Sequence, residues 1–476
     1  MRLKKILKGL YYTGKIKNVR ITGVTEILER VTKDSLFVAI RGEKTDGNAL
    51  IGEAVRRGAS AIVCEAGTDI FFDTSANISI VYVPDTRRAL ALICSNFYGN
   101  PSKNLCIVAI TGTNGKTTTA YMLWHILSKT SGKTGLIGTV ENINTGKVFS
   151  EQTTPHTEDL HKMFFEMKKN GCMYAVMEAS SQGLRQKRTE GLNFCLGIFT
   201  NFSSEHMDYH KTENEYFNSK FIINGQSDVM LVNADDSKAE AFVGAKYFSV
   251  KEKTDFFASD IVLAGKNIIF TFNVGLQKFN VHIPGIGLFN VYNALCALAA
   301  AVLIGVDAKD AVLSLSSYRG IEGRQEFIDV PYPFDVVMDF AHTPESLEQI
   351  LKALRPITEG KLICVFGCGG DRDKKKRPEM GKIAAEKSDF AIITSDNPRT
   401  EDPQSIINEI IAGIDESLYE KYTVVVDRKE AIAHAFEVAK PGDLILIAGK
   451  GHEKYQIVGT EKFPFDEKEI IKKMRL

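Results

Sequence analysis

The stretch LCIVAITGTNGKTTTAYMLWHILSKT, residues 105–130, places the tightest constraint on the fold. An apolar run typical of a buried strand leads into a glycine-rich turn and then into an amphipathic helical pattern. Gly112 and Gly115 let the backbone approach phosphate oxygens, and a helix starting near Thr117 directs free N–H groups toward them. The common phosphate loop has glycine five places before its Gly-Lys pair, where this chain has Ile110. The stretch therefore predicts a phosphate-binding loop of a less common type.

Two side chains of this loop have roles that follow from their chemistry. Lys116 would bring a positive charge to the terminal phosphates, and Thr117 would offer a hydroxyl to Mg²⁺. A Gly-Lys-Thr triplet alone arises by chance, but between a strand and a helix it predicts nucleotide binding.

The composition is that of a multidomain globular protein with small-molecule partners. A chain of 476 residues exceeds what one core supports and indicates about three domains. Lys+Arg and Asp+Glu number 59 each, so the net charge is zero. That balance gives no electrostatic footprint for nucleic acid or an anionic membrane, and we expect neither partner.

Features of an exported or membrane protein are missing from the sequence. The N-terminal residues carry charges without a sustained apolar core, and no stretch approaches about 18 apolar residues. The eight cysteines are scattered and complete no zinc-site spacing. We therefore expect a cytoplasmic monomer without membrane insertion, in which the cysteines are reduced core thiols.

Turn-rich segments at 100–104 and 318–327 divide the chain into three parts. We place the domains at residues 1–100, 101–322 and 323–476. In the last part, apolar runs alternate with helical patterns, as in a parallel α/β sheet, and each run ends in a polar cluster. Ligands of such sheets bind at the carboxyl ends of the strands, so these clusters predict a site. The clusters are DFAHTP (339–344), GCGGDRDKKKRP (367–378), SDNPR (395–399) and GKGHE (449–453).

A series of motifs in fixed order resembles the Mur ligases, cytoplasmic enzymes that add amino acids to the peptidoglycan precursor. Besides TGTNGKTT and DFAHTP, the motifs are VMEASSQG (176–183), FTNFSSEHMDYH (199–210) and GIGLFNVYNALCA (285–297). The similarity covers roughly residues 20–466 and is greatest to the members that add the third residue of the stem peptide. It implies a three-domain α/β fold: an N-terminal UDP-sugar-binding domain, a central P-loop ATPase-like domain and a C-terminal doubly wound, Rossmann-like domain for the amino acid.

The resemblance implies an ATP-dependent amide-bond ligase. The γ-phosphoryl group of ATP would convert the carboxylate of UDP-MurNAc-L-Ala-D-Glu into an acyl phosphate, which the amine of meso-2,6-diaminopimelate attacks. Cations must neutralise the charge where anionic ATP meets that carboxylate. The resemblance places the following residues at ATP: Gly112, Thr113, Asn114, Gly115, Lys116, Thr117, Thr118, Asn293, Arg324 and Asp339.

The resemblance also implies Mg²⁺ ligands, namely Thr117, Glu178, His206 and a carbamylated Lys220. A desolvated lysine with a lowered pKa can react with CO₂ and become an anionic ligand for a second Mg²⁺. Other interpretations stay open for each residue taken alone: Glu178 as a helix cap, His206 as a core histidine and Lys220 as a solvated lysine. The ordered set of motifs favours the metal site.

The segment SDNPRTEDP is similar to the Asp-Asn-Pro-Arg signature of the members specific for meso-diaminopimelate. A guanidinium can form two charge-assisted bonds with the second carboxylate of that amino acid. L-lysine would leave the guanidinium unpaired, at a cost of about 1–3 kcal/mol. The residues implied are Arg372, Asp396, Asn397, Pro398, Arg399, Gly449 and Glu453, the last accepting from the distal ammonium. Arg372 alone could instead belong to a solvated basic turn.

The acceptor end resembles the family less closely. Residues matching the implied site for the UDP-MurNAc-dipeptide are Thr153, Thr154, Ser180, Gln186 and Arg188, with Arg188 pairing a carboxylate of the D-glutamyl group. The chain has Ile27-Leu28-Glu29 where the family has Asp-Ser-Arg, and Leu28 cannot donate the hydrogen bond of that serine to uridine. Two other segments also depart from the family: Ser180-Ser181-Gln182 for Ser-Ser-His and Glu322-Gly323-Arg324 for Pro-Gly-Arg.

Two further functions therefore stay open. One is a paralogue that uses the same amine with another acyl acceptor, which the loss of Asp-Ser-Arg permits. The other is a non-catalytic ATP-binding partner of cell-wall synthesis. Against the latter stands the presence together of Lys116, Glu178, His206 and Lys220, because a binding module needs no ligand for a second metal ion.

Overall fold

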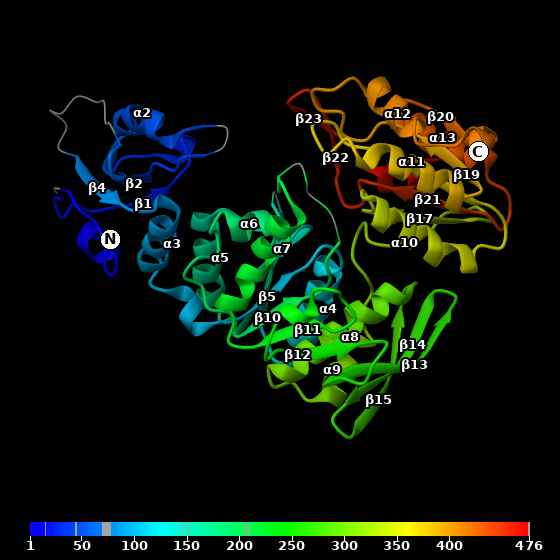
Figure 1. Cartoon of the computed structure of the whole chain (residues 1–476), viewed down its shortest axis with the longest axis horizontal. Coiled ribbons are helices and arrows are strands. Elements are labelled where there is room, and N and C mark those ends of the chain that lie inside the picture. The colour runs from blue at the N-terminus through cyan, green and yellow to red at the C-terminus, as the bar shows by residue number, and fades with distance from the viewer. Residues whose placement is uncertain are drawn as a thin grey trace.

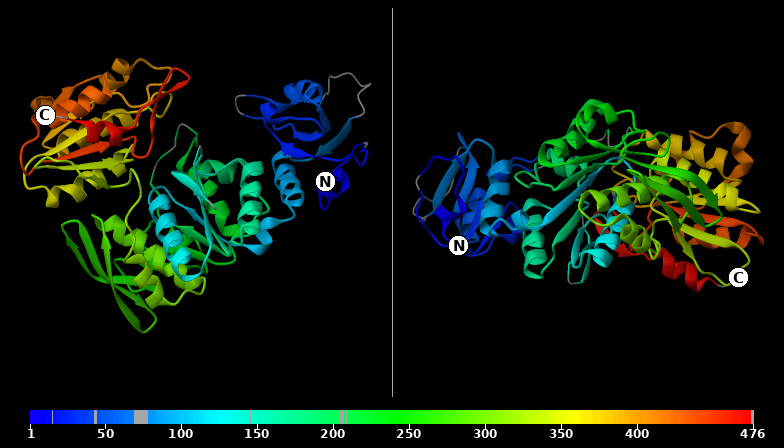
Figure 2. Two further views of the ribbon diagram at one scale, coloured as in Figure 1. Left: turned by 180° about the vertical axis from the view of Figure 1, so that it is seen from behind. Right: turned by 90° about the horizontal axis from the view of Figure 1, so that it is seen from below.

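The computed structural model describes residues 1–474 except 15, 43, 44, 69–77, 145, 151, 204, 206 and 208. In Figure 1 and in both views of Figure 2, the N-terminal and C-terminal lobes lie on either side of the central lobe. Each lobe contains a sheet with parallel strands and packed helices, so the predicted three-domain α/β fold is confirmed. Within the described part of the chain, no helix is long and apolar enough to cross a bilayer.

The N-terminal lobe has a parallel sheet in the order β1-β2-β3-β4. Its strands are β1 (Gly23–Thr25), β2 (Ser35–Val38), β3 (Ala59–Glu65) and β4 (Ser79–Val83), and its helices are α1 (Leu3–Ile6), α2 (Ile51–Arg56) and α3 (Thr86–Phe97). Asp85 starts α3 by accepting a hydrogen bond from the backbone of Arg88, as an N-cap does. Helix α3 packs against α5 of the central lobe and joins the two lobes.

The central lobe is built around a parallel sheet in which β5 lies between β9 and β10. The parallel strands are β12 (Lys246–Ser249), β11 (Met230–Asn233), β10 (Leu196–Phe199), β5 (Cys106–Thr111), β9 (Tyr174–Glu178) and β6 (Thr134–Ile137). The helices are α4 (Lys116–Thr130), α5 (Thr157–Lys169), α6 (Ser181–Arg185), α7 (Glu213–Phe221), α8 (Leu288–Leu303) and α9 (Ala308–Leu315). Residues 107–111 of β5 are fully buried, as expected of a strand with both faces covered.

Further strands extend the central sheet at both edges. At one edge, β13 (Phe256–Ala264) runs parallel to β12, and β14 (Asn267–Val274) and β15 (Gln277–Pro284) continue the sheet antiparallel. At the other edge, β7 (Glu141–Ile143) and β8 (Lys147–Phe149) pair antiparallel. Sequence analysis did not predict these strands. Gly265 and Gly275 adopt the left-handed backbone conformation at the two tight turns between β13, β14 and β15.

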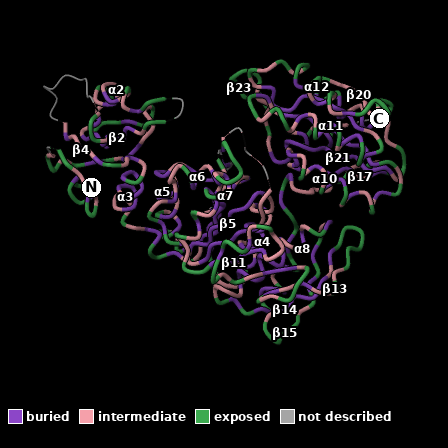
Figure 3. The backbone as a smooth tube through the Cα atoms, viewed as in Figure 1, coloured by how far each residue is buried: buried purple, intermediate pink, exposed green. Residues whose placement is uncertain are grey.

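The C-terminal lobe has a sheet in the order β16-β17-β21-β18-β19-β20, parallel except for the edge strand β16. The strands are β16 (Glu326–Ile328), β17 (Asp335–Asp339), β18 (Leu362–Phe366), β19 (Phe390–Ile393), β20 (Tyr422–Val424) and β21 (Leu444–Ala448), with a hairpin of β22 (Tyr455–Val458) and β23 (Glu461–Pro464). Helices α10 (Pro344–Leu354), α11 (Lys376–Lys387), α12 (Pro403–Ile411), α13 (Arg428–Val438) and α14 (Glu467–Lys473) surround it. Buried backbone follows β17 and β21 in Figure 3, and the four predicted polar clusters follow β17, β18, β19 and β21.

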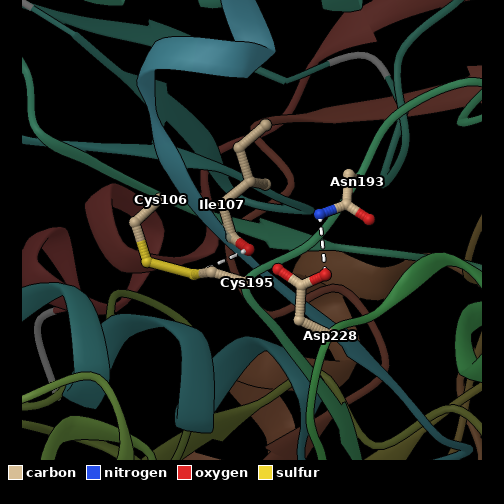
Figure 4. The surroundings of a disulfide bond; sticks show 5 residues. All are labelled: Cys106, Ile107, Asn193, Cys195 and Asp228. Carbon is tan, nitrogen blue, oxygen red and sulfur yellow. Dashed lines mark hydrogen bonds between the residues drawn. A yellow bond between two sulfur atoms is a disulfide. The ribbon is translucent and has the colours of Figure 1, made fainter.

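A disulfide joins Cys106 and Cys195 in the central lobe (Figure 4). These residues lie side by side at the amino-terminal ends of the adjacent strands β5 and β10, with Cα atoms 5.5 Å apart. The expectation that all eight cysteines are reduced core thiols is therefore wrong for this pair, because strand pairing brings together two residues separated by 89 positions in sequence. The other six cysteines are free and buried.

Candidate active site

The turn between β5 and α4 has the shape of a phosphate-binding loop. Gly112 lies in the left-handed region, and a Cβ atom there would clash with the Thr200 hydroxyl. The end of β10 supports the loop from behind: the Thr113 N–H donates to the Asn201 carbonyl at 2.9 Å, and the Asn114 N–H donates to Oδ1 of Asn201 at 2.8 Å. Loop backbone positions are thus fixed before any ligand arrives.

Two lysines converge on this loop. Lys116 Nζ donates to the carbonyls of Gly112 at 2.9 Å and Thr113 at 2.8 Å. Lys220 Nζ, from α7, donates to the same Gly112 carbonyl at 2.7 Å and lies 4.2 Å from the centre of the Tyr216 ring. Burial lowers the pKa of Lys116, and burial together with the charge of Lys116 holds the pKa of Lys220 well below the ordinary value. A neutral Lys220 amine is the form that reacts with CO₂.

Glu178 lies at the end of β9 and faces the start of α4. Its Oε2 accepts from the Thr117 hydroxyl at 2.9 Å and from the Thr139 hydroxyl at 3.0 Å, while its Oε1 accepts from the Thr139 N–H at 2.8 Å. Glu178 is fully buried. The N-cap of the helix that follows, α6, is Ser180, and the carboxylate of Glu178 instead stands beside the Thr117 hydroxyl.

Other elements contribute three more of the residues predicted for the nucleotide. Asn293 of α8 accepts from the Thr119 hydroxyl at 3.3 Å. Arg324 directs its guanidinium to the Thr117 hydroxyl at 3.4 Å and lies over the Phe340 ring. Asp339, at the end of β17, accepts from the backbone of Gln325 and Ala341, and its charge acts on Arg324. Arg324 and Asp339 thus connect the C-terminal lobe to the phosphate loop.

The donor atoms beside the phosphate loop fit a magnesium ion that also binds phosphate oxygens. Hydroxyl and carboxylate oxygens from Thr117 and Glu178 are donors that Mg²⁺ prefers, and this ion commonly takes only one or two protein ligands beside phosphate oxygens. Lys220 donates to a loop carbonyl rather than to a carboxylate, and His206 lies outside the described residues. Among the residues the structure describes, no three His, Cys, Asp or Glu side chains cluster as a protein-only metal site.

The residues predicted for the acceptor form one hydrogen-bonded network beside Glu178. Thr153 contacts the Thr139 hydroxyl at 3.1 Å, and Thr154 donates to the Glu178 carbonyl at 2.9 Å and to Ser180 at 3.1 Å. Ser180 caps α6 by accepting from the Gly183 N–H. The network continues through Arg188, which donates to the Thr154 carbonyl at 2.6 Å and to Oε1 of Gln186 at 2.8 Å.

A cavity of about 320 Å³ opens between the N-terminal and central lobes next to this network. Its wall includes Arg87 and Leu90 of α3 and, from the central lobe, His156, Gln186 and Arg188. The two guanidinium groups fit an anionic ligand.

Leu28, which replaces the serine of the family, starts a short 3-10 helix and does not line this cavity. Its side chain packs against the buried apolar cluster that includes Val31, Phe37 and Ile51. The leucine is thus used as a packing residue, and it offers a ligand no hydroxyl.

The residues predicted for the amino acid meet at the carboxyl edge of the C-terminal sheet. Arg399 adopts a left-handed backbone conformation and donates to the Gly370 carbonyl at 2.6 Å. Arg372 stands close enough for its charge to act on Arg399, whose pKa is lowered by burial and by that neighbour. A Cβ atom at Gly449 would come within 2.7 Å of Oδ2 of Asp396, so glycine lets β21 approach the Asp-Asn-Pro-Arg loop. Asn397 donates to Glu453 at 2.9 Å, and Pro398 connects the two halves of this loop.

The C-terminal lobe touches the phosphate loop directly. Glu345, in the first turn of α10, accepts from Nδ2 of Asn114 at 2.8 Å and from the Ser203 hydroxyl. His342 lies 3.8 Å from Glu205. These contacts place the C-terminal lobe against the central lobe.

Three family models match the chain, one for each lobe. They are described as Mur ligase family, catalytic domain (residues 16–98), Mur ligase middle domain (residues 110–301) and Mur ligase, glutamate ligase domain (residues 323–451). The chain belongs to the Mur ligase family.

Relatives of this Mur ligase with similar sequences include UDP-N-acetylmuramoyl-L-alanyl-D-glutamate–2,6-diaminopimelate ligases from clostridia and bacilli. The enzyme of Clostridium tetani is 41% identical over 100% of this chain and 99% of its own length. That of Bacillus licheniformis is 38% identical over 99% of each. A solved structure of a ligase with the same name has a TM-score of 0.70 at 30% identity and covers 99% of this chain and 98% of its own. A MurF structure from Acinetobacter baumannii, at 20% identity and a TM-score of 0.67, shares the fold.

Three residues of the sites in this Mur ligase were missed by sequence analysis. Thr139 follows the strand β6 and holds both oxygens of Glu178. Arg377, fully buried, donates to Glu401 and to the Gly369 carbonyl and so braces the loop that carries Arg372. Lys450 lies between the predicted Gly449 and Glu453 and is also fully buried. A charged residue two positions after the apolar run LILIA was the available signal for Lys450.

Proposed function

We propose that the chain is an ATP-dependent ligase of the MurE type, which adds meso-2,6-diaminopimelate to UDP-MurNAc-L-Ala-D-Glu and releases ADP and phosphate. The observation that carries this proposal is the contact between the two lobes that hold the predicted sites: Glu345 of α10 accepts from Asn114 of the phosphate loop at 2.8 Å. The central lobe carries the phosphate loop with Lys116 and Lys220, and the C-terminal lobe carries Arg399 with Arg372 close by. Clostridial relatives named for this reaction and aligned along the whole chain support it.

The positions of the charged side chains suggest how each substrate of the proposed reaction would be held. Backbone N–H groups of the loop and the Lys116 ammonium would hold the terminal phosphates of ATP. Arg188, fixed by Gln186 and the Thr154 carbonyl, would orient the acceptor carboxylate beside Glu178. Attack of that carboxylate on the γ-phosphorus forms the acyl phosphate and releases ADP; attack of the amine then forms the amide and releases phosphate.

Thr117 and Glu178 would hold a magnesium ion, which when bound neutralises the charge of the transferred phosphoryl group. Lys220 would hold a second ion in its carbamylated form, made by reaction of the neutral amine with CO₂. Burial favours that neutral amine, because an ammonium group loses its hydration there. His206 is proposed as a further metal ligand from sequence alone.

We place the functions of the lobes at residues 1–100 for the UDP-sugar, 101–322 for ATP and 323–476 for the amino acid. A cytoplasmic monomer that supplies peptidoglycan precursor fits this assignment.

A second candidate is a paralogue that uses the same amine with a different acyl acceptor. The packing of Leu28 into the apolar cluster favours it, because the first lobe then lacks the hydroxyl through which the family binds uridine. Both candidates use the same phosphate loop and the same amine.

Phosphate release from ATP and Mg²⁺ distinguishes the candidates. Release with meso-diaminopimelate that requires UDP-MurNAc-L-Ala-D-Glu supports the main proposal. No release with that dipeptide, but release with another carboxylate and the same amine, supports the paralogue. No release under any combination supports a non-catalytic ATP-binding protein.

The carbamate has its own test in the same assay. Lys220→Ala should abolish phosphate release, and intact-mass analysis under CO₂ should show one carbamate adduct that this variant lacks. The matched control Lys211→Ala replaces an exposed lysine just before α7, and it should keep both phosphate release and the carbamate adduct. Full activity of Lys220→Ala would refute the carbamate.

A further inference from the structure

Lys450 is a fully buried lysine at the carboxyl end of β21, between Gly449 and the predicted ammonium acceptor Glu453. Its Nζ donates to Oδ1 of Asn397 at 2.9 Å and lies 3.4 Å from Oε2 of Glu453. A lysine without solvent exposure is rare in proteins unless its charge is paired. Here the pairing is to two residues of the amino-acid site.

These contacts fix the orientation of the Asn397 amide. Its oxygen accepts from Lys450 and, at 2.9 Å, from the backbone N–H of Ile457, so the NH₂ group must point the other way. That NH₂ group donates to Oε2 of Glu453 at 2.9 Å. Within the described part of the chain, Oε1 of Glu453 accepts no hydrogen bond and is the oxygen left for a ligand.

A second buried cation supports the same loop from the other side. Arg428 of α13 donates from Nε to Glu467 of α14 at 2.6 Å and from a terminal nitrogen to the Ala448 carbonyl at 2.8 Å. Its guanidinium lies 4.0 Å from Oδ2 of Asp396. Burial would raise the pKa of Asp396, but the charges of Lys450 and Arg428 outweigh burial and lower it, so this aspartate stays ionised.

Carboxylates and cations alternate around this loop. Asp396 and Glu453 lie near Lys450 and Arg428, and the charge of Arg399 also acts on both carboxylates. An ammonium group bound at Oε1 of Glu453 would pair with a carboxylate oxygen that no donor among the described residues occupies. An anionic group at the same place would face that carboxylate without a counter-ion, which is costly.

We propose that Lys450 is a positioning residue for the amine substrate: it orients Asn397 and Glu453 so that one carboxylate oxygen faces the distal ammonium of the diamino acid. The inference rests on the proposed function for the identity of the amine. Lys450 does not contact the substrate itself, because its Nζ is enclosed by Asn397, Glu453 and, at 5.9 Å, the ring of Tyr455.

Loss of the Lys450 charge has two effects. The Asn397 amide is freed to rotate, so Glu453 loses its fixed orientation. The pKa of Asp396 loses the lowering effect of the Lys450 charge, so this carboxylate takes up a proton at higher pH than before. The other charged groups facing this loop stay in place: Arg428 and Glu467 below it, His342 beside Asp396, and Arg372 with Arg399 at the carboxylate end.

The test is calorimetric binding of meso-diaminopimelate to the full chain saturated with a non-hydrolysable ATP analogue and Mg²⁺. Lys450→Met should weaken binding roughly 10–100-fold, the range expected for one or two charge-assisted hydrogen bonds. Lys450→Arg should recover part of the loss. Lys440→Met, an exposed lysine shortly before the opposite end of β21, is the matched control and should bind like the wild type.

Two readouts separate positioning from general stability. Affinity for the ATP analogue should stay within about twofold in Lys450→Met. The affinity of that variant for the amino acid should fall more steeply on acidification than that of the wild type, because the charge of Lys450 no longer lowers the pKa of Asp396. Equal loss for both ligands, a pH dependence no steeper than that of the wild type, or wild-type affinity in Lys450→Met would overturn the inference.

Different measurements test the proposed reaction and the role of Lys450. Phosphate release dependent on the UDP-MurNAc-dipeptide decides the reaction, whereas binding of the amine decides the role of Lys450. Wild-type protein that binds no meso-diaminopimelate would overturn both the amine assignment and the positioning role.

Discussion

The phosphate loop of the central lobe and the amino-acid loops of the C-terminal lobe use buried lysines in opposite ways. Both sites lie at the carboxyl ends of parallel strands. At the phosphate loop, Lys116 and Lys220 donate to the backbone carbonyl of Gly112. In the C-terminal lobe, Lys450 donates to a side-chain amide and lies beside the Glu453 carboxylate.

The difference matches the charge of the ligand that each site would take. A polyphosphate brings several negative charges, so lysines that donate to backbone carbonyls rather than to carboxylates can turn their ammonium groups to the phosphates. A diamino acid brings both signs of charge, so its site needs fixed carboxylates as well as guanidinium groups. The first site offers ammonium groups to the ligand, and the second uses an ammonium group to orient its own carboxylate.

Removal of the loop lysine should have the largest effect on turnover. Lys116→Met should lower kcat/KM for ATP by about 10³, the scale seen when one preorganised donor to a developing negative charge is lost. Steady-state phosphate release measures it. The control Lys129→Met replaces an exposed lysine in the last turn of the same helix α4. Its kcat/KM for ATP should stay within about twofold of the wild type. A similar loss in both variants would refute a special role for the loop.

The disulfide should make the stability of the central lobe depend on redox conditions, unlike that of the C-terminal lobe. Cys106→Ser should lower the free energy of unfolding of the central lobe by about 2–4 kcal/mol, since the bond closes a loop of 89 positions. Denaturant unfolding with and without a reducing agent measures it. Reduction should not change the stability of the variant. The control Cys364→Ser replaces a free cysteine in the C-terminal lobe and should still lose stability on reduction, as the wild type does. A wild type indifferent to reduction would contradict the bond.

Loss of the guanidinium group predicted to bind the second carboxylate of the amino acid should change the selectivity for the amine. Arg399→Ala should raise KM for meso-diaminopimelate about 10–100-fold and reduce the preference over L-lysine by the same factor, because the second carboxylate loses its partner. Competition between the two amines in the phosphate-release assay measures this preference. Lys375→Ala, exposed on the neighbouring loop, should keep the preference. Unchanged selectivity in Arg399→Ala would remove this residue from the assignment.

The smallest effect concerns stability and pH at Lys220. Because its pKa is lower when folded than when unfolded, the unfolded chain binds the extra proton between those two values, and wild-type stability rises with pH in that window. Lys220→Met lacks this dependence. In CO₂-free buffer its melting temperature should exceed that of the wild type near neutral pH, and the gap should narrow as pH approaches the ordinary lysine value. A constant gap would show that Lys220 is not destabilised by burial of its charge.

Much of the site was predictable because its residues stand next to strands that the sequence marks clearly. The phosphate loop, Glu178 and the Asp-Asn-Pro-Arg loop each follow or end an apolar run. Strand ends bring the first two to one edge of the central sheet and the third to the corresponding edge of the C-terminal sheet. Thr139 was missed because a threonine after a short strand has no distinctive signal. The pairing of Cys106 with Cys195 was missed because the order of strands in the sheet cannot be read from periodicity.

The amino-acid sequence by itself determined the three α/β lobes, the type of phosphate loop and the polar clusters at the strand ends, because these depend on local pattern and spacing. Only the tertiary structure decided which charges meet. Lys116 with Lys220, Lys450 with Asn397 and Arg428 with Glu467 come from separate elements, and burial strengthens their interactions by excluding water. Side-chain burial also decided that Leu28 packs into the first lobe rather than facing the cavity.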